Sequence, residues 1–277
     1  MTTRRYRQVD VFTDVPYLGN PVAVVLDAEG LQPGQMQRFA RWTNLSETTF
    51  VLPPTDPAAD YRLRIFTPAR ELPFAGHPTL GSSHAWLGGG GSPRQGDVVV
   101  QECQAGLVPV RHVGGRLAFA APPLVRSGPV AQTDMDAVAR QLGIGRADII
   151  DAQWVDNGPG WVAVWLPSQE AVLALRPSSG DLTIGAVAPR APGAAEAVEV
   201  RAFFPVDGQT VEDPVTGSLN AALAGWLLAA GRVTPPYVAR QGTAIGRAGR
   251  VHISVSADGT IWTGGGTITC ISGSVEL

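Results

Sequence analysis

The chain contains no lysine, because all 21 of its basic residues are arginine. A Schiff base with a substrate carbonyl, an internal aldimine with pyridoxal phosphate and a Walker A phosphate-binding loop each require a lysine amine. The composition therefore excludes three large classes of mechanism.

Cysteines and long apolar runs are also scarce. The two cysteines, Cys103 and Cys270, stand apart from any Cys/His cluster, so neither a zinc site nor a disulfide framework is indicated. The longest apolar run, Ala221–Ala230, is about half as long as a membrane span requires. The basic N-terminal residues are not followed by the apolar segment of a signal peptide. We expect a reduced, cytoplasmic protein with no membrane segment.

Charge and composition limit the partners and the fold. The net charge is −3, and no basic stripe is present that could follow a phosphate backbone, so a nucleic-acid partner is not expected. Apolar residues make up 44% of the 277 residues, enough for about two packed domains. The 33 glycines and 23 prolines favour many short strands joined by turns over a helical bundle.

One pattern of residues occurs twice. The motif Arg-x-Phe-x-Pro ends at residues 68 and 205, and a motif His/Asp-Pro-x-x-Gly-Ser ends at residues 82 and 218. The two copies are thus 137 and 136 residues apart, close to half the chain length. A long repeat with only two copies indicates two similar domains. Chance similarity in a chain rich in glycine and proline is the alternative.

Each copy of the pattern leads into a predicted helix. Residues 217–231 carry no charge, and a helix that is apolar on all sides is a buried one. Its counterpart at residues 79–87 is shorter. More polar helices are predicted at residues 35–42, 135–142 and 169–175. Strands are predicted at residues 6–12, 22–26, 61–66, 97–101, 108–112, 161–166, 198–204, 251–256 and 267–276.

These elements predict an α+β fold. We expect two similar domains related by a pseudo-twofold duplication, each a curled, barrel-like sheet around a central buried helix. The expected domains are residues 1–124 and 128–277, with the last strand able to return to the first domain.

The starts of the two buried helices are the first candidate site. Helix N-termini attract carboxylates and phosphates through free backbone N–H groups. His77 and Asp213 occupy equivalent positions before them, so we expect both to face one cleft that holds a small carboxylate. The alternative is that Asp213 or Ser218 only caps its own helix.

Glu47 is a second candidate. It lies between a helix that ends near residue 42 and an apolar strand that starts near residue 50. Apolar surroundings raise the pKa of a carboxyl group, which suits a general acid/base. The alternative is an ordinary polar connection.

Two further carboxylates precede the candidate residues of the repeat. Glu71 comes shortly before His77, and Glu212 adjoins Asp213, where a like charge raises a pKa. The alternative for both is a solvated loop carboxylate. The glycine clusters of the chain lack the spacing of a dinucleotide-binding motif, so no cofactor is expected. Because the chain has no Cys/His cluster, no metal ion is expected either.

Four segments together resemble the phenazine biosynthesis PhzF-like family, and the resemblance runs from about Arg5 to the C-terminus. It implies a diaminopimelate epimerase-like fold of two similar domains, an active site between them, and a homodimer. The four segments are Asn44–Phe50, Phe66–Gly81, Val211–Ser218 and Gln241–Arg247.

The resemblance also implies a reaction. The best-known family member isomerises trans-2,3-dihydro-3-hydroxyanthranilate without a cofactor. Glu47 matches the family's catalytic glutamate, which takes a proton from one carbon and returns one to another, while His77 and Asp213 match residues that position the substrate. The segments that line the site and hold the substrate carboxylate contain Ser46, Gly76, Gly217 and Ser218.

Three alternatives accompany this interpretation. Racemases of a related branch use two cysteines at the helix starts, but residues 74–77 and 213–216 contain no thiol, so this class is rejected. An epimerase that uses Glu47 and Asp213 as its acid/base pair, and a non-catalytic small-molecule binding protein on the same fold, stay open. Pro214 and Val215 stand where phenazine enzymes have small residues, so the substrate is left open.

Overall fold

The computed structural model describes residues 2–277, which fall into two compact units. Unit 1 consists of residues 2–120 and 264–277, and unit 2 of residues 121–263. The division expected from the sequence assigned 128–277 to the second domain and allowed the last strand to return to the first. In the structure the last strand packs within unit 1.

Unit 1 is a mixed sheet wrapped around helix α2 (Gly76–Gly88). Neighbouring strands run in the order β18, β1, β2, β3, β4, β6, β7, β8. The β2/β3 and β4/β6 pairs are parallel and the others antiparallel, and the short β5 pairs with β4. The strands are β1 (Thr3–Val11), β2 (Asn20–Val25), β3 (Glu47–Leu52), β4 (Tyr61–Phe66), β5 (Glu71–Leu72), β6 (Val98–Cys103), β7 (Gly106–Val113), β8 (Arg116–Ala120) and β18 (Thr267–Glu276).

Unit 2 repeats this order of pairing around helix α5 (Gly217–Ala229). Neighbouring strands begin in the order β9, β10, β11, β12, β13, and the β11/β12 pair is parallel. Strand β14 pairs with β13 as β5 does with β4, and β13/β15 is parallel as β4/β6 is. The strands are β9 (Arg126–Pro129), β10 (Asp151–Asp156), β11 (Trp161–Trp165), β12 (Thr183–Pro189), β13 (Val198–Val206), β14 (Gln209–Asp213), β15 (Tyr237–Gln241), β16 (Gly249–Val255) and β17 (Ile261–Gly265), in which the chain passes to unit 1.

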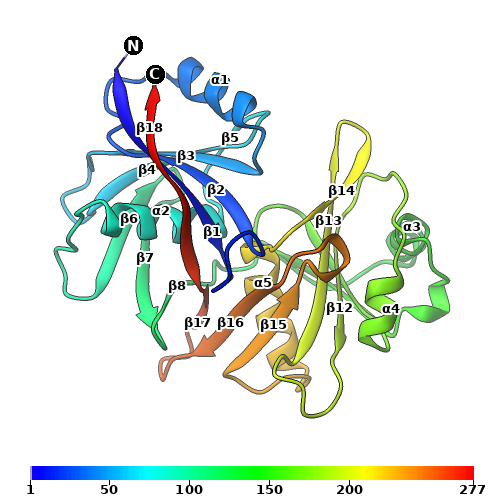
Figure 1. Cartoon of the computed structure of the whole chain (residues 1–277). Helices are drawn as coiled ribbons and strands as arrows, with labels where there is room; N and C mark the ends of the chain where they lie inside the picture. Colours follow the sequence, from blue (N-terminus) through cyan, green and yellow to red (C-terminus); the bar gives the residue numbers. More distant parts are fainter. Residues whose placement is uncertain (1) are drawn as a thin grey trace. The chain divides into compact units, whose positions relative to one another are not determined.

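The shared order of strands confirms the duplication and the fold class predicted from the sequence. Figure 1 shows α2 among β1, β8 and β18, which come from the two ends of unit 1. Neither central helix carries an acidic residue, a lysine or an arginine, and most residues of each are buried, so each is enclosed by its own sheet.

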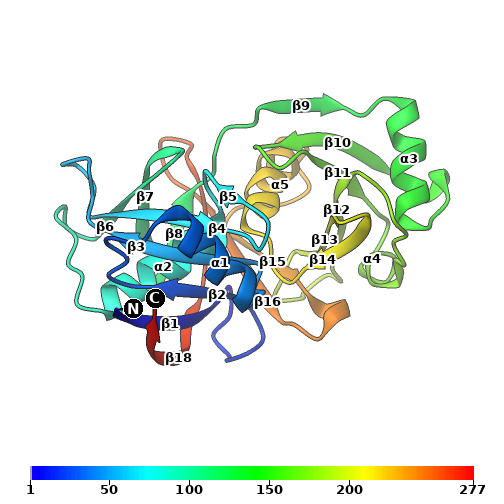
Figure 2. The ribbon, with the colours of Figure 1, turned by 90° about the horizontal axis from the view of Figure 1, so that it is seen from above.

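Smaller helices cover the opposite faces of the sheets. In unit 1, α1 (Pro33–Thr43) packs Met36 and Phe39 against Phe50 and Phe66. In unit 2, Figure 2 shows α3 (Gln132–Leu142) and α4 (Gln169–Ala174) on the side of β11–β13 that faces away from α5. Two short 3-10 turns complete this unit, at Arg146–Asp148 and Thr243–Ile245. No helix within residues 2–277 is long and apolar enough to cross a membrane.

The sequence patterns missed several strands that sheet pairing stabilises. Strand β12 has the sequence Thr-Ile-Gly-Ala-Val-Ala-Pro, in which small residues weaken the intrinsic preference for a strand. Its glycine is required by packing, because a Cβ atom at Gly185 would lie 2.4 Å from Leu219 of α5. Tertiary contact thus overrides local preference in this strand.

Two helical glycines should respond in opposite ways to substitution by alanine. In α2, a Cβ atom at Gly81 would lie 2.4 Å from Cγ1 of the buried Val22, so Gly81→Ala should lower the free energy of unfolding by about 1–3 kcal/mol. In α5, nothing lies within 4 Å of a Cβ atom at Gly225, so Gly225→Ala should raise it by up to about 1 kcal/mol. Urea denaturation of both variants tests this, and equal effects would contradict it.

Candidate functional site

Glu47 is the first residue of β3, four residues after the end of α1. Helix α1 ends at Thr43, the left-handed backbone of its C-cap residue Asn44 (φ 55°) turns the chain, and the partly buried Ser46 leads into the strand. In the sheet Glu47 pairs with Val22 of the neighbouring β2. Its side chain is 15% exposed. The sheet thus holds this carboxyl group in a mostly buried position.

His77 lies beside Glu47. It is the second residue of α2, and its Nε2 atom is 3.3 Å from Oε2 of Glu47. On the other side of the ring, Nδ1 is 3.4 Å from Nδ2 of the buried Asn20 at the start of β2. The structure therefore brings together two of the predicted site residues of unit 1.

Burial keeps the His77 ring uncharged. Desolvation lowers the pKa of His77 from 6.5 to about 3, and a hydrogen bond to the backbone of Pro21 opposes this shift only in part. The ring is 5% exposed. The contact between His77 and Glu47 is therefore one between a carboxyl group and a neutral imidazole, not an ion pair.

Gly76 opens α2 directly before His77. The N-cap residue, Ala75, has no side-chain acceptor, so no side chain of that residue occupies the N–H groups of the first turn. The start of the helix lies three residues earlier than the sequence predicted. This extension places Gly76 and His77 within the helix itself.

Asp213 ends β14 in unit 2, and the chain then enters α5. Its Oδ2 atom accepts a hydrogen bond of 2.6 Å from the hydroxyl of Thr216. Thr216 is the N-cap residue of α5, yet its side chain makes no capping bond to the helix. The hydroxyl that would ordinarily cap the helix serves Asp213 instead.

Gly217 and Ser218 form the first turn of α5. The Ser218 hydroxyl accepts a hydrogen bond of 3.1 Å from the indole N–H of Trp161, and its carbonyl accepts one from the Asn157 amide. Ser218 is therefore anchored to β11 and to the loop before it. This differs from the simple capping role considered as an alternative.

The carboxylates Glu71 and Glu212 are neither solvated nor catalytic candidates in this structure. Each forms a bidentate pair with an arginine on the adjacent strand: Arg64 with Glu71 at 2.7 and 2.6 Å, and Arg201 with Glu212 at 3.0 and 2.7 Å. Each guanidinium also lies over the ring of the phenylalanine two residues further along, at 5.2 and 4.9 Å from its centroid. The duplicated motif thus encodes a clamp in each unit, and the charge of Glu212 beside Asp213 is compensated.

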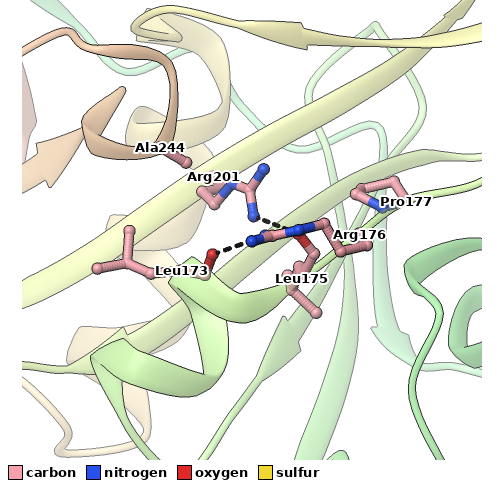
Figure 3. A pocket seen from close by; sticks show the side chains of 6 residues that line it. All are labelled: Leu173, Leu175, Arg176, Pro177, Arg201 and Ala244. Atoms are coloured by element: carbon pink, nitrogen blue, oxygen red, sulfur yellow. Dashed lines mark hydrogen bonds between the residues drawn. The ribbon is translucent and has the colours of Figure 1, made fainter.

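A pocket of about 510 Å³ lies next to the clamp of unit 2 (Figure 3). Arg201 donates from Nη1 to the carbonyls of Val172 and Leu175, and Arg176 donates to three carbonyls at the end of α4. These guanidinium groups therefore close the C-terminus of α4, and the pocket contains none of the predicted site residues. It is lined by Leu173, Leu175, Arg176, Pro177, Arg201 and Ala244.

Sequence reasoning missed the buried amides that support these residues. Asn20 and Gln241 are buried and contact His77 and the Asp213–Thr216 segment respectively. Asn20 is the one polar residue of β2, and Gln241 opens one of the four segments that carry the family resemblance, and these were the available signals. Within residues 2–277 no group of three or more His, Cys, Asp or Glu side chains is arranged to hold a metal ion.

The model of the family described as "Phenazine biosynthesis-like protein" matches residues 9–268. The antisense-enhancing sequence 1 of Schizosaccharomyces pombe is 37% identical, covering 99% of both chains. The trans-2,3-dihydro-3-hydroxyanthranilate isomerase of Pseudomonas fluorescens is 38% identical, covering 87% of both chains.

Among solved structures, a PhzF-family phenazine biosynthesis protein of Bacillus anthracis superposes with a TM-score of 0.85 over 100% of both chains. At 23% identity this similarity bears on the fold alone. It agrees with the diaminopimelate epimerase-like architecture implied by the resemblance in sequence.

The neutral, buried His77 should make stability depend on pH. Unfolded His77 binds a proton near pH 6.5, whereas the folded ring does so only near pH 3. Between these values the unfolded state holds more protons, so this residue lowers the free energy of unfolding by up to about 1.4 kcal/mol per pH unit as the pH falls. His77→Gln should remove this contribution.

The test is urea denaturation of wild type and His77→Gln at a series of pH values. The stability of wild type relative to the variant should decrease as the pH falls below about 6.5. His112→Gln, which alters an exposed histidine, is the control. A difference between wild type and His77→Gln that stays constant with pH would contradict burial of a neutral ring.

Proposed function

The chain belongs to the phenazine biosynthesis-like protein family and is an isomerase, and we propose that it moves a proton on a small carboxylate without a cofactor. Membership of the family is shown by the match over residues 9–268 and by relatives that include isomerases at 35–38% identity. The proposed reaction is of the type named for the Pseudomonas fluorescens relative, the isomerisation of trans-2,3-dihydro-3-hydroxyanthranilate.

Glu47 is the proposed general acid/base. The observation that carries this assignment is the contact of 3.3 Å between its carboxyl group and a neutral His77. An imidazole whose pKa lies near 3 is a poor proton acceptor at neutral pH, so the role of base is given to Glu47 and not to His77. Glu47 takes a proton from one carbon of the substrate and, after the carboxyl proton has exchanged with solvent, gives one to another carbon, so that no net proton is gained or lost.

His77 and Asp213 are proposed to position the substrate. The neutral ring can donate one hydrogen bond from Nε2 without adding a charge, which fixes the direction of the Glu47 carboxyl group. Asp213 is itself oriented by Thr216. The backbone N–H groups and hydroxyls of the remaining candidates would hold the substrate carboxylate, since helix N-termini favour negative charge. These candidates are Ser46, Gly76, Gly217 and Ser218.

The homodimer and the cytoplasmic location expected from the sequence stay predictions. An epimerase with Glu47 and Asp213 as its acid/base pair is the main alternative function. The neutral partner beside Glu47 favours a single shuttling carboxylate, because one group then serves as base and as acid in turn.

Replacing Glu47 by glutamine should lower turnover at least about a hundredfold, since general acid/base catalysis contributes about 10²–10⁴-fold. The protein is incubated in D₂O with trans-2,3-dihydro-3-hydroxyanthranilate, and the proton spectrum is followed. Deuterium should enter the product at a carbon other than the one deprotonated, in wild type and in the control Glu29→Gln, whose carboxylate is exposed.

Other outcomes would select other functions. Deuterium at a single stereocentre, with inversion, would indicate an epimerase, and no incorporation together with tight binding would indicate a binding protein. If Glu47→Gln kept most of the activity, the assignment of the general acid/base would be wrong.

A further inference from the structure

Gln241 occupies a central place beside Asp213. It is the last residue of β15 and is fully buried. Its Nε2 atom donates to the carbonyl oxygen of Asp213 at 3.1 Å and to the hydroxyl of Thr216 at 2.9 Å. Its Oε1 atom accepts from the backbone N–H of Thr216 at 3.0 Å and from the Asn220 amide at 2.8 Å. Two donated and two accepted bonds use the full hydrogen-bonding capacity of the amide.

The partners determine the orientation of this amide. In the reversed orientation Oε1 would face the carbonyl oxygen of Asp213, and Nε2 would face two N–H donors. Both contacts would be repulsive, so only the observed orientation satisfies all four partners. In the one orientation that satisfies all four partners, the Gln241 amide donates a hydrogen bond to the Thr216 hydroxyl.

This donor directs the single proton of the Thr216 hydroxyl. Because Oγ1 of Thr216 accepts from Gln241, its own O–H is directed to Oδ2 of Asp213, 2.6 Å away. The backbone N–H of Thr216, at the start of α5, is bound by Gln241, and the Thr216 hydroxyl makes no capping bond to the helix. A chain of bonds thus runs from the amide through the hydroxyl to the carboxylate.

Unit 1 also contains a buried glutamine that bonds a threonine, but at other positions of the repeat and without a carboxylate. Gln101 on β6 is fully buried, and its Nε2 atom donates to the hydroxyl of Thr79 near the start of α2 at 3.0 Å. Strand β6 corresponds to β15 in the duplicated order of strands, but in the repeated motif Thr79 stands where unit 2 has Val215, and Leu80 stands where it has Thr216. The position equivalent to Asp213 holds His77, whose ring contacts Asn20 and Glu47. The chain of bonds from an amide through a hydroxyl to a carboxylate therefore belongs to unit 2.

We propose that Gln241 is a positioning residue for Asp213, acting through the hydroxyl of Thr216. This inference rests on the proposed function, in which Asp213 orients the substrate. A hydrogen bond donated to a carboxylate favours its ionised form and fixes its direction. The neighbouring charges are Glu212, next to Asp213 on β14, and Arg201 on β13, and these two compensate each other.

The main variants are Thr216→Val, which removes the hydroxyl at nearly constant volume, and Thr216→Ser, which keeps it. Thr216→Val should lower kcat about 10- to 100-fold, as expected for losing one hydrogen bond to a charged group, and Thr216→Ser should restore most of it. The matched control is Thr79→Val, which breaks a buried Gln–Thr bond in unit 1 that leads to no carboxylate. It should lower stability but leave kcat near the wild-type value.

A second variant tests the amide itself. Gln241→Met removes the donor to the hydroxyl, so it should lower kcat, and adding Thr216→Val to it should cost little more. Such non-additivity is expected of residues that act through one chain of bonds. Fully additive losses of kcat would overturn the action of Gln241 through Thr216, and a Thr216→Val enzyme with the kcat of Thr79→Val would overturn the inference as a whole.

One readout needs no substrate. The carboxyl carbon of Asp213 is followed by NMR against pH in wild type and in the three threonine variants. Thr216→Val should titrate at a higher pH than wild type, while Thr216→Ser and Thr79→Val should follow wild type. The same titration curve in Thr216→Val and wild type would overturn the inference even if the isomerase reaction is observed. Absence of turnover by wild type would instead count against the proposed substrate, and the titration, extended to Gln241→Met, would still decide the role of Gln241.

Discussion

Enclosure of an uncharged helix is the constraint on which the rest of each unit depends. Helices α2 and α5 contain no aspartate, glutamate, lysine or arginine, so both must be removed from water on all sides. The sheet of each unit encloses its helix. Helix and sheet approach so closely that no side chain lies between them at Gly81 in α2 or at Gly185 beside α5. The first turn of each helix is then the place where backbone N–H groups need partners from elsewhere in the fold.

Both units place a buried glutamine near this turn, but only Gln241 bonds a backbone N–H group there. A buried glutamine, Gln101 or Gln241, donates to a threonine near the helix start, and an Arg–Glu clamp secures the strand pair that leads to it. At the first position of the repeated motif His/Asp-Pro-x-x-Gly-Ser, unit 1 has the neutral His77 and unit 2 has Asp213. A duplicated scaffold thus carries two chemically different groups at equivalent positions.

The difference between these groups follows from how each is solvated. His77 is buried, and desolvation favours its neutral form. Asp213 accepts a hydrogen bond from a hydroxyl whose direction is set by Gln241. Beside His77, Glu47 keeps a partly exposed carboxyl group. A neutral imidazole next to a carboxyl group fits the proposed reaction, in which one carboxyl group removes a proton and later delivers one.

The sequence by itself determined the duplication, both central helices and the class of fold, and it identified Glu47 and His77 as candidate site residues. These depend on local signals: apolar runs without charge, repeated motifs and short segments matched to a family. Only the tertiary structure decided that Glu71 and Glu212 are clamped by arginines, that β12 is a strand despite its small residues, and that Asn20 and Gln241 support the candidate site. Such contacts join residues many positions apart, and which buried polar group meets which partner depends on strand register that no local pattern contains.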